Sequence, residues 1–122
     1  MNTLVEKLVQ INGFDLDSTE IKDVVQSIDS NGLSLINNTV NFLIQEQKGG
    51  DLVSQSLSQL DLRRKFYLLA LLVNKSNDLL LYPADLREKQ MQVWANDLNV
   101  SQDLIRAVMI VGGEKILNKL ED

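Results

Sequence analysis

The feature that most constrains the fold of this chain is a continuous apolar segment near its middle. From Phe66 to Val73 every residue is apolar or tyrosine, within the stretch DLRRKFYLLALLVNK that opens at Asp61. A helix that is apolar on all sides is normally buried by several neighbours. We therefore predict that this segment is the central helix of the protein. The alternative is that one of its faces forms a dimer interface.

The first half of the chain predicts four shorter helices, because apolar residues recur there at helical spacing. They cover residues 3–11, 17–30, 34–47 and 51–57. Asp17 and Glu20 have the spacing of a capping box at the start of the second helix. We expect the helices to end or break at glycines, because glycine and asparagine tolerate left-handed backbone angles. The predicted breaks are Gly13, Asn31-Gly32 and Gly49-Gly50.

The segment Leu79, Leu80, Leu81 and Tyr82 precedes the single proline, Pro83. Proline disfavours helical geometry in the residue before it, so we predict an extended connection. Its leucines are expected to fill the core; if they are exposed, the segment is a docking loop. Pro83 suits the first turn of the next helix, which we expect to run to about Leu98.

The last third, from Glu88 to Leu120, predicts a helix, a tight turn, a second helix capped by Ser101, Gly112-Gly113 and a terminal helix. Its pattern is typical of helix-turn-helix units. The alternative function is therefore a DNA-binding regulator that uses Gln102 and Arg106. The second helix also carries Asp103, however, and supplies little positive charge for phosphates. The residues that match the unit are Ala95, Leu98, Asn99, Val100, Ile105 and Val108.

The same third resembles a family of short, uncharacterised bacterial helical proteins, which implies a compact helical unit and no known activity. The residues that carry this resemblance are Trp94, Leu98, Val100, Ser101, Ala107, Val108, Val111 and Gly112. The stretch from Phe66 to Val108 is also similar to TerB-like tellurite-resistance domains. Three leucines follow Asp78 where that family continues with acidic residues, so no metal site is predicted.

Residues 14–19 resemble the first motif of haloacid-dehalogenase-type phosphatases, an Asp-x-Asp followed by a small residue and threonine. The resemblance implies a nucleophile at Asp15, a proton shuttle at Asp17 and bound magnesium. That family needs a parallel sheet, whereas the rest of this chain predicts helices. A helix start, where such side chains bond to free N–H groups, is the favoured interpretation. A small magnesium-dependent phosphatase is the remaining alternative.

Composition argues against most catalytic chemistry. The chain has no histidine and no cysteine, so it lacks the commonest general base, the commonest metal ligand and any thiolate nucleophile. We expect no enzyme activity, no cofactor and no metal. No stretch approaches the roughly 20 apolar residues that cross a bilayer, and no signal peptide is predicted. We therefore expect a cytoplasmic protein that does not contact a membrane.

The net charge of −5 falls entirely in the first half, because residues 1–60 hold three lysines and eight acidic residues. Residues 61–122 are neutral overall, with one basic cluster, Arg63-Arg64-Lys65. An acidic surface favours a basic protein partner over nucleic acid. The predicted contacts for such a partner are Asp15, Asp17, Glu20 and Asp23, with Leu79, Leu80, Leu81 and Tyr82 as an apolar dock.

Together these patterns predict one all-α domain over residues 1–122, a compact bundle of six to eight helices around residues 66–73. Trp94, Leu98, Ile105 and Val108 are expected in the same core. The leading functional prediction is a non-catalytic protein-protein interaction module: a bacterial or phage regulator, adaptor or inhibitor, either monomeric or homodimeric.

Overall fold

The structure is a computed structural model that describes residues 3–11, 15–46 and 51–121. Within these ranges it contains eight α-helices, one 3-10 helix and no strand, so the predicted all-α bundle is confirmed. The predicted breaks at Gly13 and Gly49-Gly50 lie outside the described residues. The helices are α1 (Thr3–Val9), α2 (Thr19–Gln26), α3 (Ser30–Glu46), α4 (Asp51–Ser58), α5 (Leu62–Lys75), η1 (Asp78–Leu81), α6 (Ala84–Leu98), α7 (Gln102–Val111) and α8 (Gly113–Glu121).

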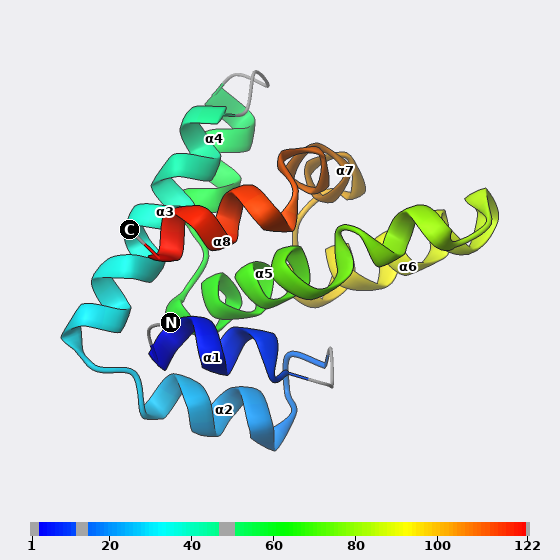
Figure 1. Ribbon diagram of the computed structural model, residues 1–122. Coiled ribbons are helices and arrows are strands. Elements are labelled where there is room, and N and C mark those ends of the chain that lie inside the picture. The colour runs from blue at the N-terminus through cyan, green and yellow to red at the C-terminus, as the bar shows by residue number, and fades with distance from the viewer. Residues whose placement is uncertain (1–2, 12–14, 47–50, 122) are drawn as a thin grey trace.

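Helix α5 is the centre of the bundle, as its apolar sequence predicts. All side chains from Phe66 to Leu72 are buried. Figure 1 shows why: α1 and α8, which also contact each other, lie next to α5, and α2 and α3 pack against it as well. This burial covers the faces of α5 that could have formed a dimer interface. One hydrophobic cluster joins residues from Leu4 to Leu120, so both halves of the chain contribute to it.

Polar groups fix the two ends of α5. Asp61 is its N-cap, as predicted, and one carboxylate oxygen accepts a hydrogen bond from the Arg64 backbone N–H at 2.8 Å. Near the other end, the Asn74 amide donates to the Leu8 carbonyl at 2.7 Å. That carbonyl lies in the last turn of α1, where its backbone partner is the Ile11 N–H at 3.5 Å. The contact therefore ties α1 to the central helix.

The boundary between α2 and α3 differs from the prediction. Asn31 and Gly32 do not stop a helix; they lie in the first turn of α3, and α2 already ends at Gln26. The reason is Asp29, whose carboxylate accepts a hydrogen bond from the Gly32 N–H at 2.8 Å. An aspartate in this position starts a helix. The capping box also differs, because the Ser18 hydroxyl caps α2 by accepting from the Ile21 N–H at 3.3 Å.

The turn between α6 and α7 follows the predicted pattern. Asn99 adopts the left-handed conformation, with φ 58° and ψ 46°, and the Ser101 hydroxyl caps α7. Proline stands one residue before α6, at its N-cap, and not in its first turn. The predicted core is confirmed, since four residues are at most 2% exposed: Trp94, Leu98, Ile105 and Val108.

Candidate functional site

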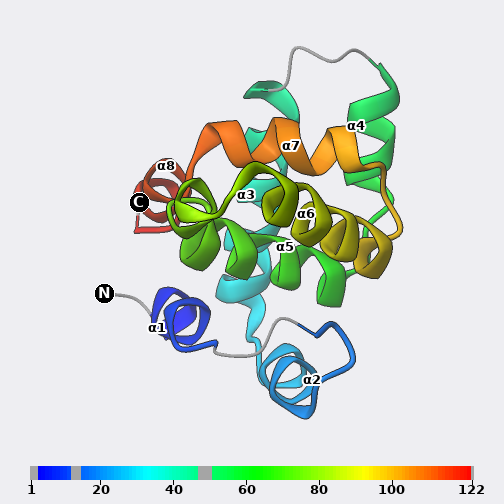
Figure 2. The same ribbon diagram turned by 90° about the vertical axis from the view of Figure 1, so that its right-hand side faces the viewer.

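A large, mainly apolar concavity in the described part of the chain lies between η1, α6 and α7, the last two of which pack against each other. We call it the groove. It encloses about 590 Å³. Figure 2 shows α7 lying across α6 on this side of the molecule. Its walls include Leu79 and Leu80 of η1, Arg87 and Met91 of α6, and Met109 and Ile110 of α7.

The geometry of η1 determines which leucines reach this surface. The predicted extended connection is wrong: Asp78–Leu81 form one 3-10 turn, and only Tyr82, the residue before proline, is extended. A 3-10 helix has three residues per turn, so consecutive side chains point in three directions. Leu79 therefore enters the core at 5% exposure, while Leu80 and Leu81 are 72% and 83% exposed. The expectation that the leucines fill the core holds for Leu79 alone.

Ile110 completes the exposed rim, with 82% of its surface accessible. It follows the buried Val108 by two positions, which places it on the outer side of α7. Met91 is buried and Met109 half-buried beneath this rim. Methionine side chains are flexible and polarisable, so they adapt to differently shaped apolar partners. Large exposed apolar groups gathered around a concavity are typical of a binding surface.

The charges beside the groove neutralise each other, with one exception. The Glu88 carboxylate accepts hydrogen bonds from Gln102 and Arg106, both at 2.6 Å. Arg106 also pairs with Asp103 at 2.8 Å. The two side chains predicted to read DNA thus donate to carboxylates of their own chain. Arg87 lines the groove and forms no ion pair with any other described residue.

The four predicted acidic contacts fall into two pairs. Asp15 and Asp17 form the turn before α2, where the Asp15 carboxylate accepts from the Asp17 N–H at 3.0 Å. Asp17 also lies 3.5 Å from the Arg63 guanidinium, which offsets its charge. Glu20 and Asp23 are exposed one turn apart on α2 and have no ion pair with the described residues. The carboxylates of Glu20 and Asp23 therefore remain without an ion-pair partner among the described residues.

The Asp15–Asp17 turn lacks the surroundings of a phosphatase. No strand supports it in the described residues, and these residues contain no group of three or more carboxylates, histidines or cysteines placed to hold a metal. Phe14, which opens the resemblance, lies outside them. Ser18 next to the pair serves as the cap of α2. The local bonds are those of the helix start that the sequence favours.

The Tyr67 side chain is buried, and its hydroxyl is influenced by the carboxylates of Asp97 and Asp15. It donates a hydrogen bond to Asp97 at 3.0 Å and so links α5 to the last turn of α6. Burial raises the pKa of Tyr67 far above its usual value, and the negative charges of Asp97 and Asp15 add to this effect. The hydroxyl therefore stays protonated as a donor, and its arrangement is structural.

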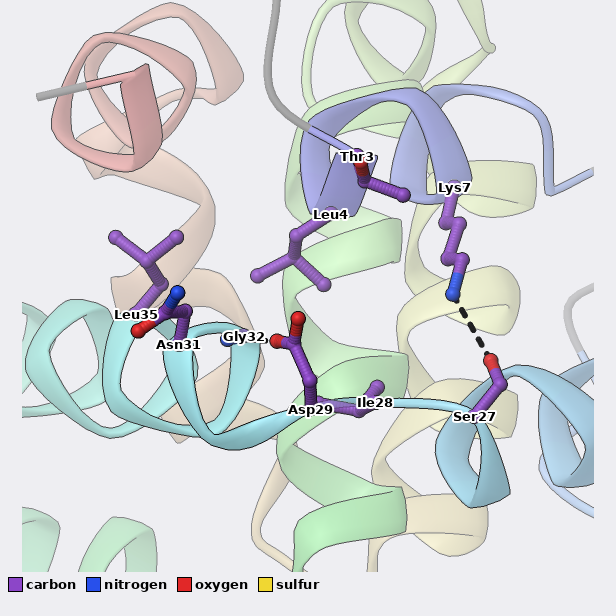
Figure 3. A pocket seen from close by; sticks show the side chains of 9 residues that line it. All are labelled: Thr3, Leu4, Lys7, Ser27, Ile28, Asp29, Asn31, Gly32 and Leu35. Carbon is purple, nitrogen blue, oxygen red and sulfur yellow. Dashed lines mark hydrogen bonds between the residues drawn. The ribbon is translucent and has the colours of Figure 1, made fainter.

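A second, polar concavity of about 220 Å³ lies between α1 and the start of α3 (Figure 3). Three of its polar side chains, Lys7, Ser27 and Asp29, are engaged with the protein itself. The Lys7 ammonium donates to the Ser27 hydroxyl at 2.9 Å, and Asp29 caps α3. Leu4 and Leu35 form its apolar sides. This concavity follows from the α2–α3 junction that the sequence did not predict.

Comparisons with protein-family models, with curated proteins and with solved structures gave no match. The resemblances drawn from sequence patterns therefore stay predictions. Among the described residues, every helix is too short or too polar to cross a membrane.

Proposed function

We propose that this chain is a non-catalytic protein-interaction module, acting as a regulator, adaptor or inhibitor in a bacterial or phage cytoplasm. The groove binds an amphipathic helix of a partner protein. The observation that carries the proposal is the rim formed by Leu80 and Ile110, which line the concavity and are 72% and 82% exposed. Helix-in-groove recognition uses apolar anchors spaced along one face of the bound helix.

The form of the groove favours a protein segment over a small molecule. Pockets for small ligands bury most of the ligand and present several convergent polar groups. Here the largest rim side chains extend into solvent, and the polar groups near them are paired with one another, as the Glu88–Arg106 contact shows. Such a surface offers contact area along an open edge, which suits an elongated apolar partner.

The charge of Arg87 in the groove further defines the kind of helix that the groove would bind. Arg87 is the lining charge that lacks a counter-ion among the described residues. A partner carboxylate placed beside it would form a charge-assisted hydrogen bond and fix the register of the bound helix. We therefore assign to the partner an amphipathic helix whose apolar face carries one flanking acidic residue.

The acidic side of α2 supplies a second proposed contact. Glu20 and Asp23 face a basic region of the partner, because their charges are exposed and uncompensated. In Figures 1 and 2, α2 and α7 lie on opposite sides of α5. The acidic contact and the groove therefore engage different regions of the partner.

The test is affinity capture from a lysate of the native host, read by mass spectrometry in nuclease-treated and untreated arms. Wild type is compared with Ile110→Glu and Arg87→Glu in the groove, and with Leu33→Glu as a matched control. Leu33 is 40% exposed on α3 and does not line the groove. We expect both groove variants to lose about tenfold or more of the captured partner, as hot-spot substitutions do, while the control retains it.

Two outcomes would overturn the proposal. Equal capture by Ile110→Glu and Leu33→Glu would show that the groove is not the binding surface. Capture that disappears with nuclease would favour the helix-turn-helix alternative, in which Gln102 and Arg106 leave Glu88 to contact nucleic acid. Salt-dependent binding of the purified chain to duplex DNA would then be the confirming measurement.

A further inference from the structure

We propose that the chain forms a symmetric homodimer through the outer face of α6. This face carries Leu86 and Val93, each 50% exposed, and Tyr82, two residues before α6 begins and 39% exposed, lies beside them. We call these three residues the α6 stripe. They surround a shallow concavity of about 280 Å³ together with Lys89 and Gln90.

The stripe is unexpected because α6 already buries a different face. Met91, Trp94 and Leu98 fill the core, whereas Leu86 and Val93 stand at a spacing of seven residues on the exposed side. A soluble helix normally presents one apolar stripe, and its other faces are polar. A second apolar stripe at heptad spacing is typical of a helix that packs against another helix.

Self-complementarity identifies the occupant as a second copy. A two-fold interface brings the same patch from both copies together in reversed orientation. If two α6 helices cross in antiparallel orientation midway between residues 87 and 88, the start of α6 in one copy, beside Tyr82, lies toward Val93 of the other. The same crossing places Lys89 of one copy over Leu86 of the other, where its aliphatic stem covers apolar surface.

The charges on α6 fit this crossing. Asp85 precedes Leu86, so the ammonium of Lys89 from one copy reaches the Asp85 carboxylate of the other. Both side chains are exposed, and neither has an ion pair with another described residue. Because the interface is two-fold symmetric, it contains two Lys89–Asp85 pairs. Residues 61–122 carry no net charge, so the two faces meet without the repulsion that the acidic first half would create.

The dimer surface is separate from the groove. The α6 residues that line the groove are Ala84, Arg87, Glu88 and Met91, and none of them belongs to the stripe or its concavity. The dimer can therefore fail while the proposed partner binding stands, and the reverse also holds. Helix α5 cannot supply the interface, because its apolar segment is buried within one copy.

The test is the molar mass of the full chain, measured by light scattering and sedimentation velocity from about 1 to 200 µM, a range set by ordinary dimer affinities. We expect wild type to approach twice the 13.8 kDa mass of one chain. Leu86→Asp should weaken dimerisation about tenfold or more. Ile110→Glu, on the groove, is the matched control and should remain dimeric.

Exchanging the charges of Asp85 and Lys89 tests the proposed antiparallel crossing of the two α6 helices. Asp85→Lys and Lys89→Asp should each weaken the dimer, because each brings like charges together across the two-fold axis. The double variant Asp85→Lys, Lys89→Asp restores opposite charges and should dimerise like wild type. Far-UV circular dichroism should be unchanged in all of them, since both positions are exposed. A monomeric wild type throughout, a Leu86→Asp variant that remains dimeric, or a double variant weaker than either single variant would overturn the proposal.

Discussion

At Gly113 the backbone of α8 comes close to the backbone of α5, and replacing this glycine by alanine tests how tightly the two helices pack. Gly113 is buried, and its N–H donates to the Ser76 hydroxyl at 2.8 Å. A β-carbon at this position would stand 2.3 Å from the Leu72 carbonyl oxygen and 2.8 Å from the Ser76 hydroxyl. The carbonyl belongs to the backbone of α5 and cannot rotate away. Helix α8 must therefore shift.

Opposing effects determine how much this shift of α8 lowers the free energy of unfolding. Forcing an additional methyl group into a packed site costs about 1–3 kcal/mol. Alanine also restricts the unfolded chain, which returns about 0.4–1 kcal/mol where the backbone angles permit it. Displacing α8 weakens the burial of Ile116 and Leu120, both 0% exposed. We expect Gly113→Ala to lower the free energy of unfolding by about 2 kcal/mol, or roughly 8 °C in Tm.

Urea unfolding followed by far-UV circular dichroism measures this change. Gly32→Ala is the matched control, because Gly32 is also a buried glycine in the first turn of a helix. Its β-carbon would meet the Cγ2 methyl of Ile28 at 2.9 Å, and that half-buried side chain can move. The control should stay within about 0.5 kcal/mol of wild type, since the helical gain offsets the contact. Equal stability of the two variants would refute the close packing of α8 on α5.

Two further predictions concern buried aromatic residues. Trp94 is 2% exposed, so Trp94→Ala should cost about 3–5 kcal/mol, and an unchanged melting curve would contradict the packing of α6. The folded-state pKa of Tyr67 is raised, chiefly by burial and then by Asp97, so the unfolded chain loses this proton first as pH rises. Stability is therefore fully present below about pH 10, the ordinary tyrosine pKa, and falls above it. Urea midpoints measured up to pH 11 should fall more steeply for wild type than for Tyr67→Phe, with Tyr82→Phe as the control; identical slopes would exclude the effect.

Features that depend on a few neighbouring residues could be predicted from the sequence. The caps at Asp61 and Ser101 need only a side-chain oxygen three residues before a free N–H. The turn at Asn99 needs one residue that tolerates a left-handed backbone. The burial of residues 66–72 follows from composition alone, because a helix with no polar face must be surrounded.

The wrong prediction at Asn31-Gly32 shows a limit of reasoning from neighbouring residues alone. Both residues tolerate the left-handed backbone that ends a helix, but this tolerance does not force the helix to end there. Asp29, three residues before Gly32, supplies a cap that starts α3 instead. The two possibilities use overlapping residues, and the Asp29 cap is the one that forms. An aspartate at that spacing was the signal available in the sequence.

The groove could be predicted only in part. The sequence singled out the leucines of η1, but the turn divides them among the core, the groove and solvent. Arg87 and Ile110 were missed, because their role depends on how η1, α6 and α7 come together. Arg106 was noticed for its charge, and its pairing with Glu88 arises only when α6 and α7 pack. Ile110 did carry a local signal, since it lies off the buried face of α7.

The position of α8 also governs when the protein can fold during its synthesis. Helix α8 packs against α5, α3 and α1, so α1 and α8 share one core. Domains fold as units while the ribosome delivers the chain from its N-terminus. The apolar face of α5 that α8 covers therefore stays uncovered until Ile116 and Leu120 have left the exit tunnel.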